Sequence, residues 1–154
     1  FASELYVQNM IFDYATEYYW SHPQPSSPDS LMITENDLEQ FRTFLTGKKF
    51  AYKTDSESIL EELTKAAREE GLYDANREVL DELKSGLSHT LEREMTLYRS
   101  EVTELLESEL AGRYFYDWGM VEYSLSRDTQ VREAVSIAGD RSRYASLLRA
   151  PAGI

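Results

Sequence analysis

The feature that most constrains the fold is the helical periodicity of apolar residues, which continues through almost the whole chain. Apolar side chains recur at spacings of three and four residues, and no convincing alternation typical of β-strands interrupts them. This spacing places apolar side chains on one face of an α-helix, where they are buried against other helices. The sequence therefore predicts an all-α fold, an elongated helical bundle of about six helices.

The first helix is expected over about residues 3–20, with Ser3 as its cap. The proline-rich stretch SHPQPSSPDS follows, and because proline disrupts a helix interior, this stretch is expected to be a surface linker. A second helix is predicted at about 34–46, where Thr34 and Asp37 resemble a capping box.

The third helix is predicted at about 55–70, with a capping box formed by Thr54 and Glu57. Gly71 follows it, and glycine favours the left-handed backbone that ends many helices. The buried face of this helix is expected to comprise Ile59, Leu60, Leu63 and Ala67.

One long helix is predicted over about 74–111. Its weak point is Gly86, because glycine in a helix interior costs about 1 kcal/mol relative to alanine, and the helix can break there. The apolar residues that carry the pattern are Leu80, Leu83, Leu87, Leu91, Met95, Tyr98, Val102, Leu105 and Leu106.

A last helix is expected over about 129–138, because Asp128 is a good cap and Gly139 a good terminator. Residues 139–154 have weak periodicity and are expected to form an irregular tail. With 154 residues and no obvious linker long enough to separate two domains, residues 3–138 are interpreted as a single helical domain.

Charge and composition exclude several classes of function. The net charge of −12 and the absence of a basic cluster argue against nucleic-acid binding, which depends on Lys and Arg at the phosphates. No apolar stretch is long enough to predict a membrane span in this fragment. The chain has no cysteine, so disulfides, thiol nucleophiles and cysteine metal sites are excluded.

The sequence predicts no catalytic residue, no cofactor site and no metal site. His22 lies beside Pro23 in the linker, and His89 has no carboxylate four residues away. The helical metal motifs HExxH and ExxH are absent, and no nucleophile or phosphate-loop motif occurs. The acidic runs, such as Glu104–Glu109, are interpreted as solvated helix faces rather than as acid–base pairs.

Aromatic residues crowd the stretch GRYFYDWGMVEYSLSRD, residues 112–128. As a continuous helix it would be apolar on nearly all sides, which is typical of a core helix or of a helix covered by another domain or subunit. Gly112 and Gly119 would then share a face that admits a neighbouring helix. A core, an interface and a small-molecule pocket all remain open, and the residues predicted for the interface are Tyr114, Phe115, Tyr116, Trp118, Met120 and Tyr123.

Two segments together resemble the region that follows the protease core in bacterial carboxyl-terminal processing peptidases, the S41 serine protease family, in its long Bacteroidetes-like forms. The first is an N-terminal helix with Met10-Ile11-Phe12-Asp13-Tyr14-Ala15 and Tyr18. The second carries Arg113-Tyr114-Phe115-Tyr116, Gly119, Glu122-Tyr123-Ser124-Leu125, Asp128, Val131 and Ala134. Residues 41–52 and 66–74 are similar to intervening parts of the same region, so the resemblance covers most of residues 4–138.

The resemblance implies an accessory helical domain of a protease that uses a serine nucleophile, a lysine base and a PDZ domain. The chain starts at Phe1 and is expected to be a piece of a longer polypeptide. The implied partners are the upstream protease core and a further copy in a homo-oligomer, and the implied location is the periplasm or cell envelope. Packing on the core, oligomer contacts and limits on substrate access are the expected roles.

Two alternatives remain. One is a free-standing helical binding or scaffold protein that docks partners through an acidic and aromatic surface. The other is a small enzyme with a buried cluster of glutamates.

Overall fold

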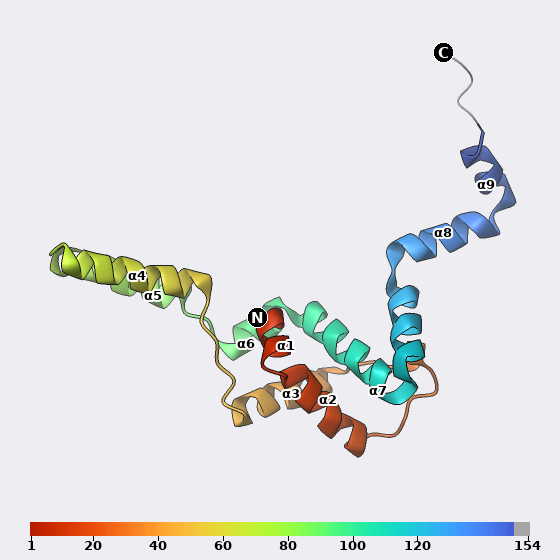
Figure 1. Ribbon diagram of the computed structural model, residues 1–154, viewed down its shortest axis with the longest axis horizontal. Helices are drawn as coiled ribbons and strands as arrows, with labels where there is room; N and C mark the ends of the chain where they lie inside the picture. The colour runs from red at the N-terminus through yellow and green to blue at the C-terminus, as the bar shows by residue number, and fades with distance from the viewer. Residues whose placement is uncertain (150–154) are drawn as a thin grey trace, which may run out of the picture. The chain divides into compact units, whose positions relative to one another are not determined.

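The computed structural model describes residues 1–149 and contains α-helices, one short 3-10 helix and, within those residues, no strand (Figure 1). The predicted all-α fold is therefore confirmed. The helices form two compact units, one comprising residues 1–10 and 34–103 and the other residues 11–33 and 104–149. The interpretation of residues 3–138 as one domain stays a prediction.

The first unit contains α1, Ala2–Val7, and the run from α3 to α6: Glu35–Gly47, Asp55–Glu69, Tyr73–Leu87 and Leu91–Leu97. The second unit contains nearly all of α2 (Met10–Ser21), the 3-10 turn η1 (Pro28–Ser30) and most of α7 (Arg99–Arg127). It also contains α8 (Thr129–Gly139) and α9 (Arg141–Leu147).

Both predicted capping boxes are present. At the start of α3, the Thr34 hydroxyl accepts from the Asp37 N–H at 3.3 Å, and the Asp37 carboxylate accepts from the Thr34 N–H at 2.8 Å. At the start of α4, Thr54 and Glu57 do the same, at 3.2 and 2.9 Å. Each box satisfies backbone donors that have no partner inside the helix, which explains why these two starts are readable from sequence.

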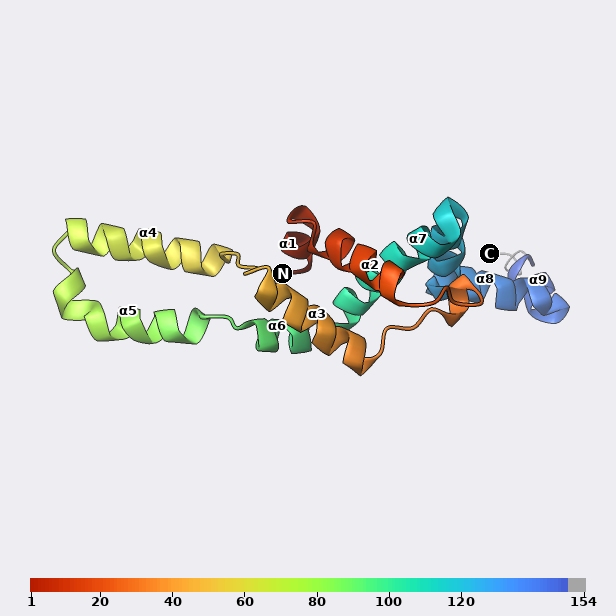
Figure 2. The ribbon, with the colours of Figure 1, turned by 90° about the horizontal axis from the view of Figure 1, so that it is seen from below.

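Helices α4 and α5 lie side by side as an antiparallel hairpin (Figures 1 and 2). Gly71 has a φ of 74°, a conformation that glycine adopts without steric cost, and it reverses the chain between the two helices. Leu60 and Leu80 are buried. The wider buried face predicted for α4 is wrong, because Ile59 and Leu63 are 64% and 51% exposed.

The single long helix predicted over 74–111 is also wrong. Helix α5 ends at Leu87, Gly86 remains helical, and an extended connector at 88–90 leads into α6. Thr90 caps α6, since its hydroxyl accepts from the Arg93 N–H at 3.3 Å. A second interruption at Tyr98 separates α6 from α7. The apolar spacing continues through both breaks, so periodicity alone predicts a continuous helix.

The first predicted helix is likewise divided, because Asn9 has a φ of 58° and separates α1 from α2. Asparagine tolerates this left-handed backbone better than most residues. Ser3 is not the cap, since the cap position is Phe1 and it makes no side-chain hydrogen bond.

In the predicted irregular tail, residues 141–147 form α9. Asp140 caps it, because its carboxylate accepts from the backbone N–H groups of Ser142 and Arg143, both at 3.0 Å. The part of the tail prediction that falls on residues 150–154 lies outside the described residues.

Candidate interaction surface

The aromatic stretch is built around a sharp bend in α7. Tyr116 has φ 60° and ψ −159°, a backbone conformation that is nearly restricted to glycine, and it divides the helix into 99–115 and 117–127. A Cβ atom on Gly119 would lie 2.3 Å from the Phe115 Cβ atom and 2.7 Å from the Ala111 carbonyl oxygen. Glycine is therefore required where the two segments meet.

The expectation that Gly112 and Gly119 share one helix face is wrong, because the bend lies between them. A Cβ atom on Gly112 would lie 2.9 Å from the sulfur atom of Met120. The neighbour that the two glycines admit is thus the other segment of α7 rather than a separate helix.

The bent segment is held by a buried carboxylate, Glu107. Its Oε2 atom accepts from the Tyr123 hydroxyl at 2.8 Å and from the Arg127 guanidinium at 3.0 Å. Its Oε1 atom accepts from the backbone N–H of Ile33 at 2.9 Å. Burial, and then the hydrogen bond to Glu107, raise the pKa of Tyr123, so the phenol stays a proton donor. This carboxylate fixes residues 117–127 to residues 104–115.

The interpretation of Glu107 as part of a solvated acidic face is wrong, since only 6% of the residue is exposed. The sequence does indicate that Glu107 lies on a buried helix face. The apolar residues Leu110 and Ala111, three and four residues farther on, share the helix face of Glu107, and both are fully buried.

Arg113 joins α7 to α2 within the second unit. Its Nη2 atom donates to the Phe12 carbonyl at 2.7 Å and to the Thr16 hydroxyl at 2.9 Å. The guanidinium lies 4.4 Å from the Phe12 ring centroid and forms an ion pair with Glu109. Arg113 therefore joins two segments of the second unit rather than facing outward.

Tyr114 lies beside α2 and the linker that follows it. Its hydroxyl donates to the His22 carbonyl at 3.2 Å, and its carbonyl accepts from the Gln24 side-chain amide at 3.2 Å. The second bond supplies a donor to a carbonyl near the bend, where the regular helical pattern ends. Burial raises the pKa of Tyr114, in keeping with its place in the core.

An apolar groove lies between residues 118–125 and α8. We call it the α7–α8 groove; its volume is about 430 Å³, and its apolar side chains are Trp118, Val121, Leu125, Val131 and Val135. Trp118 is 72% exposed and Val135 67%. Asp128 caps α8 by accepting from the N–H groups of Gln130 and Val131, as the sequence predicts, and so sets the turn between the two walls.

The six residues predicted for an interface are divided by the bend. Tyr114 and Tyr123 are buried in the second unit, and Phe115 is partly buried. Tyr116, Trp118 and Met120 are exposed, and Trp118 alone of the six lines the groove. The valine and leucine residues of the groove were not among the six predicted for an interface. Helical spacing places Trp118, Val121 and Leu125 on one face, but it does not show whether that face is covered.

In the first unit, a second aromatic cluster lies at the base of the α4–α5 hairpin. The Tyr52 hydroxyl donates to the buried Glu94 carboxylate at 3.0 Å, and the Tyr52 ring centroid lies 4.5 Å from that of His89. His89 Nδ1 is 3.3 Å from Glu57 Oε1. The bond from the Thr54 backbone is the largest cause that lowers the pKa of Glu57. These groups link residues 51–54, which lead into α4, to residues 88–90, which follow α5.

The polar groups of these clusters have partners within the protein. Within residues 1–149, no group of three or more His, Asp or Glu side chains is arranged to hold a metal ion. In the same part of the chain, no helix has the length and hydropathy of a membrane span. The phenols and carboxylates described above bond to one another, to basic side chains or to backbone groups, and Glu107 with Tyr123 holds the bend in α7.

The comparisons with known proteins show the family of the chain. A family model described as "Probable PDZ-protease, C-terminal helical domain" matches residues 1–138. The chain belongs to this family. The match covers α1 to nearly the end of α8, so the bend and the α7–α8 groove are both within the family's helical domain. The comparisons with curated proteins and with solved structures gave no match.

Proposed function

We propose that this helical domain is a non-catalytic part of an S41-type carboxyl-terminal processing serine peptidase, and that it packs on the protease core of the same polypeptide through the α7–α8 groove. A domain packed on the protease core could also form oligomer contacts or restrict the entry of substrate. The observation that carries the proposal is the exposed groove in a chain whose family is the helical domain of a PDZ protease.

The exposure of the groove is energetically unfavourable in water. Burying an apolar side chain of the valine or leucine class stabilises a protein by about 1.5–3 kcal/mol relative to leaving it exposed. Val121 and Leu125 are 47% and 48% exposed, and Trp118 and Val135 more so. A contiguous apolar patch of this kind is typical of an interaction site. Its apolar lining favours a protein side chain over a polar small molecule.

The serine–lysine chemistry, the S41 assignment and an exported location rest on the resemblance of the two motif segments. The motif residues have structural roles in the domain. Arg113 and Tyr114 bond to α2 and its linker, Gly119 permits the bend, and Tyr123 bonds to Glu107. Such roles fit an accessory domain, with the nucleophile and base expected in the protease core.

The test supplies the protease core and PDZ domain as a separate polypeptide and measures its binding to the 154-residue chain by calorimetry. We expect Trp118→Ala to weaken binding by about tenfold or more, as expected for an aromatic anchor. Trp20→Ala is the matched control, because Trp20 lies on α2, outside the groove, and is 80% exposed. Equal losses from both variants contradict the groove as the contact.

The proposal as a whole fails if the chain neither binds the core nor changes its peptidase activity. A free-standing scaffold is the competing interpretation. It requires a reading frame without a protease core upstream of Phe1, which sequencing of the gene decides.

A further inference from the structure

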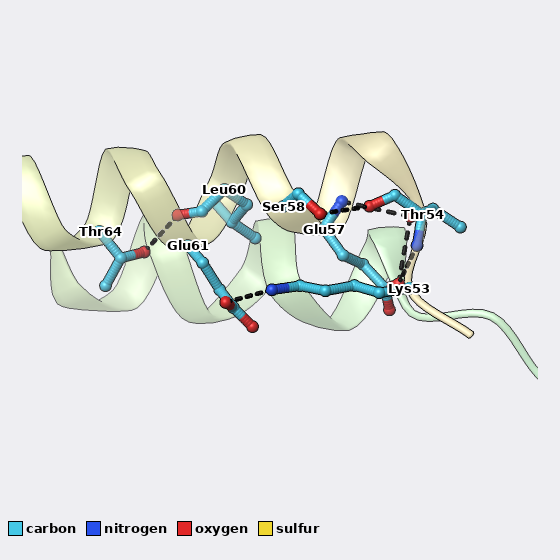
Figure 3. A network of polar contacts seen from close by, with 7 residues as sticks. All are labelled: Lys53, Thr54, Glu57, Ser58, Leu60, Glu61 and Thr64. Carbon is cyan, nitrogen blue, oxygen red and sulfur yellow. Dashed lines mark hydrogen bonds and ion pairs between the residues drawn. The ribbon is translucent and has the colours of Figure 1, made fainter. Parts of the chain in front are cut away.

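The α4–α5 hairpin has two unlike faces. One is polar and is lined by side chains such as Glu57, Glu61 and Thr64 from α4, with Tyr73, Asp81 and Lys84 from α5. On this side Lys53 forms an ion pair with Glu61, Thr54 and Glu57 form the capping box, and the Thr64 hydroxyl donates to the Leu60 carbonyl at 2.7 Å (Figure 3). Its polar groups are largely satisfied within the hairpin.

The opposite face is apolar. With 100° between successive residues, Ile59 and Leu63 lie on the side of Leu60 that is remote from Glu57 and Glu61. The same rotation on α5 places its exposed apolar residues on the side of Leu80 remote from Asp81 and Lys84. We call this surface the apolar hairpin face; its residues are Ile59, Leu63, Val79, Leu83 and Leu87, with exposures of 64%, 51%, 57%, 45% and 38%.

Acidic residues border the apolar hairpin face on both sides. Asp55 and Glu62 lie along its α4 edge, and Glu82 lies along its α5 edge. All three are exposed, and within the described part of the chain none forms an ion pair. By contrast, Lys65 is paired with Glu69 and Arg77 with Asp81. The charge left unpaired at the borders is thus negative.

We propose that the apolar hairpin face binds a basic amphipathic helix of another protein, which lies along the hairpin as a third helix. Two antiparallel helices present a groove into which the apolar stripe of a third helix fits at about 8–10 Å between axes. Lysine or arginine residues beside that stripe would meet the two acidic borders. This binding site is separate from the α7–α8 groove and does not depend on the role proposed for it.

The charges select this occupant over two others. A second copy of the chain, packed face to face, would bring acidic borders against acidic borders, and like charges at an interface oppose association. An anionic membrane surface would be repelled by the same residues. A basic helix is the occupant for which both the apolar face and its borders are complementary.

The test uses the full chain and a fluorescein-labelled peptide of about 18 residues, long enough to form an amphipathic helix, made of leucine and lysine. A second peptide carries glutamate in place of every lysine. We expect the lysine peptide to bind, measured by fluorescence anisotropy, and to bind more weakly as salt is raised from about 0.05 to 0.5 M. Equal binding of the glutamate peptide, or absence of binding, overturns the proposal.

Variants then locate the site. Glu62→Lys with Glu82→Lys is expected to weaken binding of the lysine peptide by about tenfold. The matched control is Glu61→Lys with Asp81→Lys, which changes the net charge equally on the polar face and is expected to weaken it less than about twofold. Equal losses would mean non-specific attraction to an acidic protein and would overturn the site.

The apolar contribution is tested with Leu63→Gln and Leu83→Gln, which leave the net charge unchanged. Both side chains are about half exposed, so we expect the far-ultraviolet circular dichroism spectrum to be retained and peptide binding to fall about tenfold. Retained binding in a folded variant contradicts the apolar hairpin face as the contact.

Discussion

The phenol of Tyr123 donates a 2.8 Å hydrogen bond to the buried carboxylate of Glu107, sixteen residues earlier in the same helix. In a straight helix these residues would lie more than four turns apart. The bend at Tyr116 brings them together, and Arg127 adds a 3.0 Å ion pair to the same oxygen. This contact fixes residues 117–127, which include one wall of the α7–α8 groove, to residues 104–115.

Removing the phenol oxygen is expected to weaken the fold. Tyr123→Phe leaves a buried carboxylate without one of its donors, and hydrogen bonds to charged groups contribute about 1.5–3 kcal/mol. We expect a loss of that size in the free energy of unfolding, measured with urea. Tyr116→Phe is the matched control, because Tyr116 is 80% exposed, and a change within about 0.5 kcal/mol is expected. A loss in the control as large as in Tyr123→Phe would contradict the role of Glu107.

The bend itself is strained, so glycine at position 116 is expected to stabilise the protein. A non-glycine residue in this backbone region costs about 1–3 kcal/mol, whereas glycine loses about 0.5–1 kcal/mol through its greater freedom when unfolded. Tyr116→Gly should therefore raise the free energy of unfolding by about 0.5–2 kcal/mol. Asp117→Gly, at the next residue in regular helix, should lower it. A Tyr116→Gly variant that is less stable than wild type argues against the bend in solution.

Glycine substitutions distinguish the bend from an ordinary helix position. Gly119→Ala would place a Cβ atom 2.7 Å from the Ala111 carbonyl oxygen, a backbone atom that cannot move without shifting the helix. We expect a loss of about 1–3 kcal/mol in the free energy of unfolding. Gly86→Ala has nothing within 4 Å in α5 and should gain about 0.5–1 kcal/mol. Thermal unfolding of both variants decides this, and a gain at position 119 would rule out the close approach.

The capping box at the base of the hairpin predicts a pH dependence. The Thr54 backbone bond holds the pKa of Glu57 below its usual value of 4.5. A lowered carboxyl pKa contributes stability above the unfolded pKa, and this contribution is lost as the pH falls through the lower folded pKa. Glu57→Gln should therefore have a lower urea midpoint than wild type near pH 7, and the two midpoints should converge as the pH falls through the lowered pKa of Glu57. A difference that persists at low pH would assign the loss to packing instead of charge.

Local signals in the sequence determined the fold class and several helix starts. Thr34 with Asp37, Thr54 with Glu57, and Asp128 are side chains that bond to backbone groups within three residues, so neighbours along the chain are enough to specify them. The aromatic motif was equally visible, and it indicated the family that the match over residues 1–138 shows.

Tertiary structure decided where the helices break and which apolar residues remain exposed. The break at 88–90 and the bend at Tyr116 occur within continuous apolar periodicity. The bend persists because residues distant in sequence, such as Ile33, Glu107 and Tyr123, bond to one another only when the chain folds back. The exposure of apolar residues on the α4–α5 hairpin could not be predicted for a related reason. A helical pattern identifies an apolar face, but only the helices packed against that face decide whether it is covered.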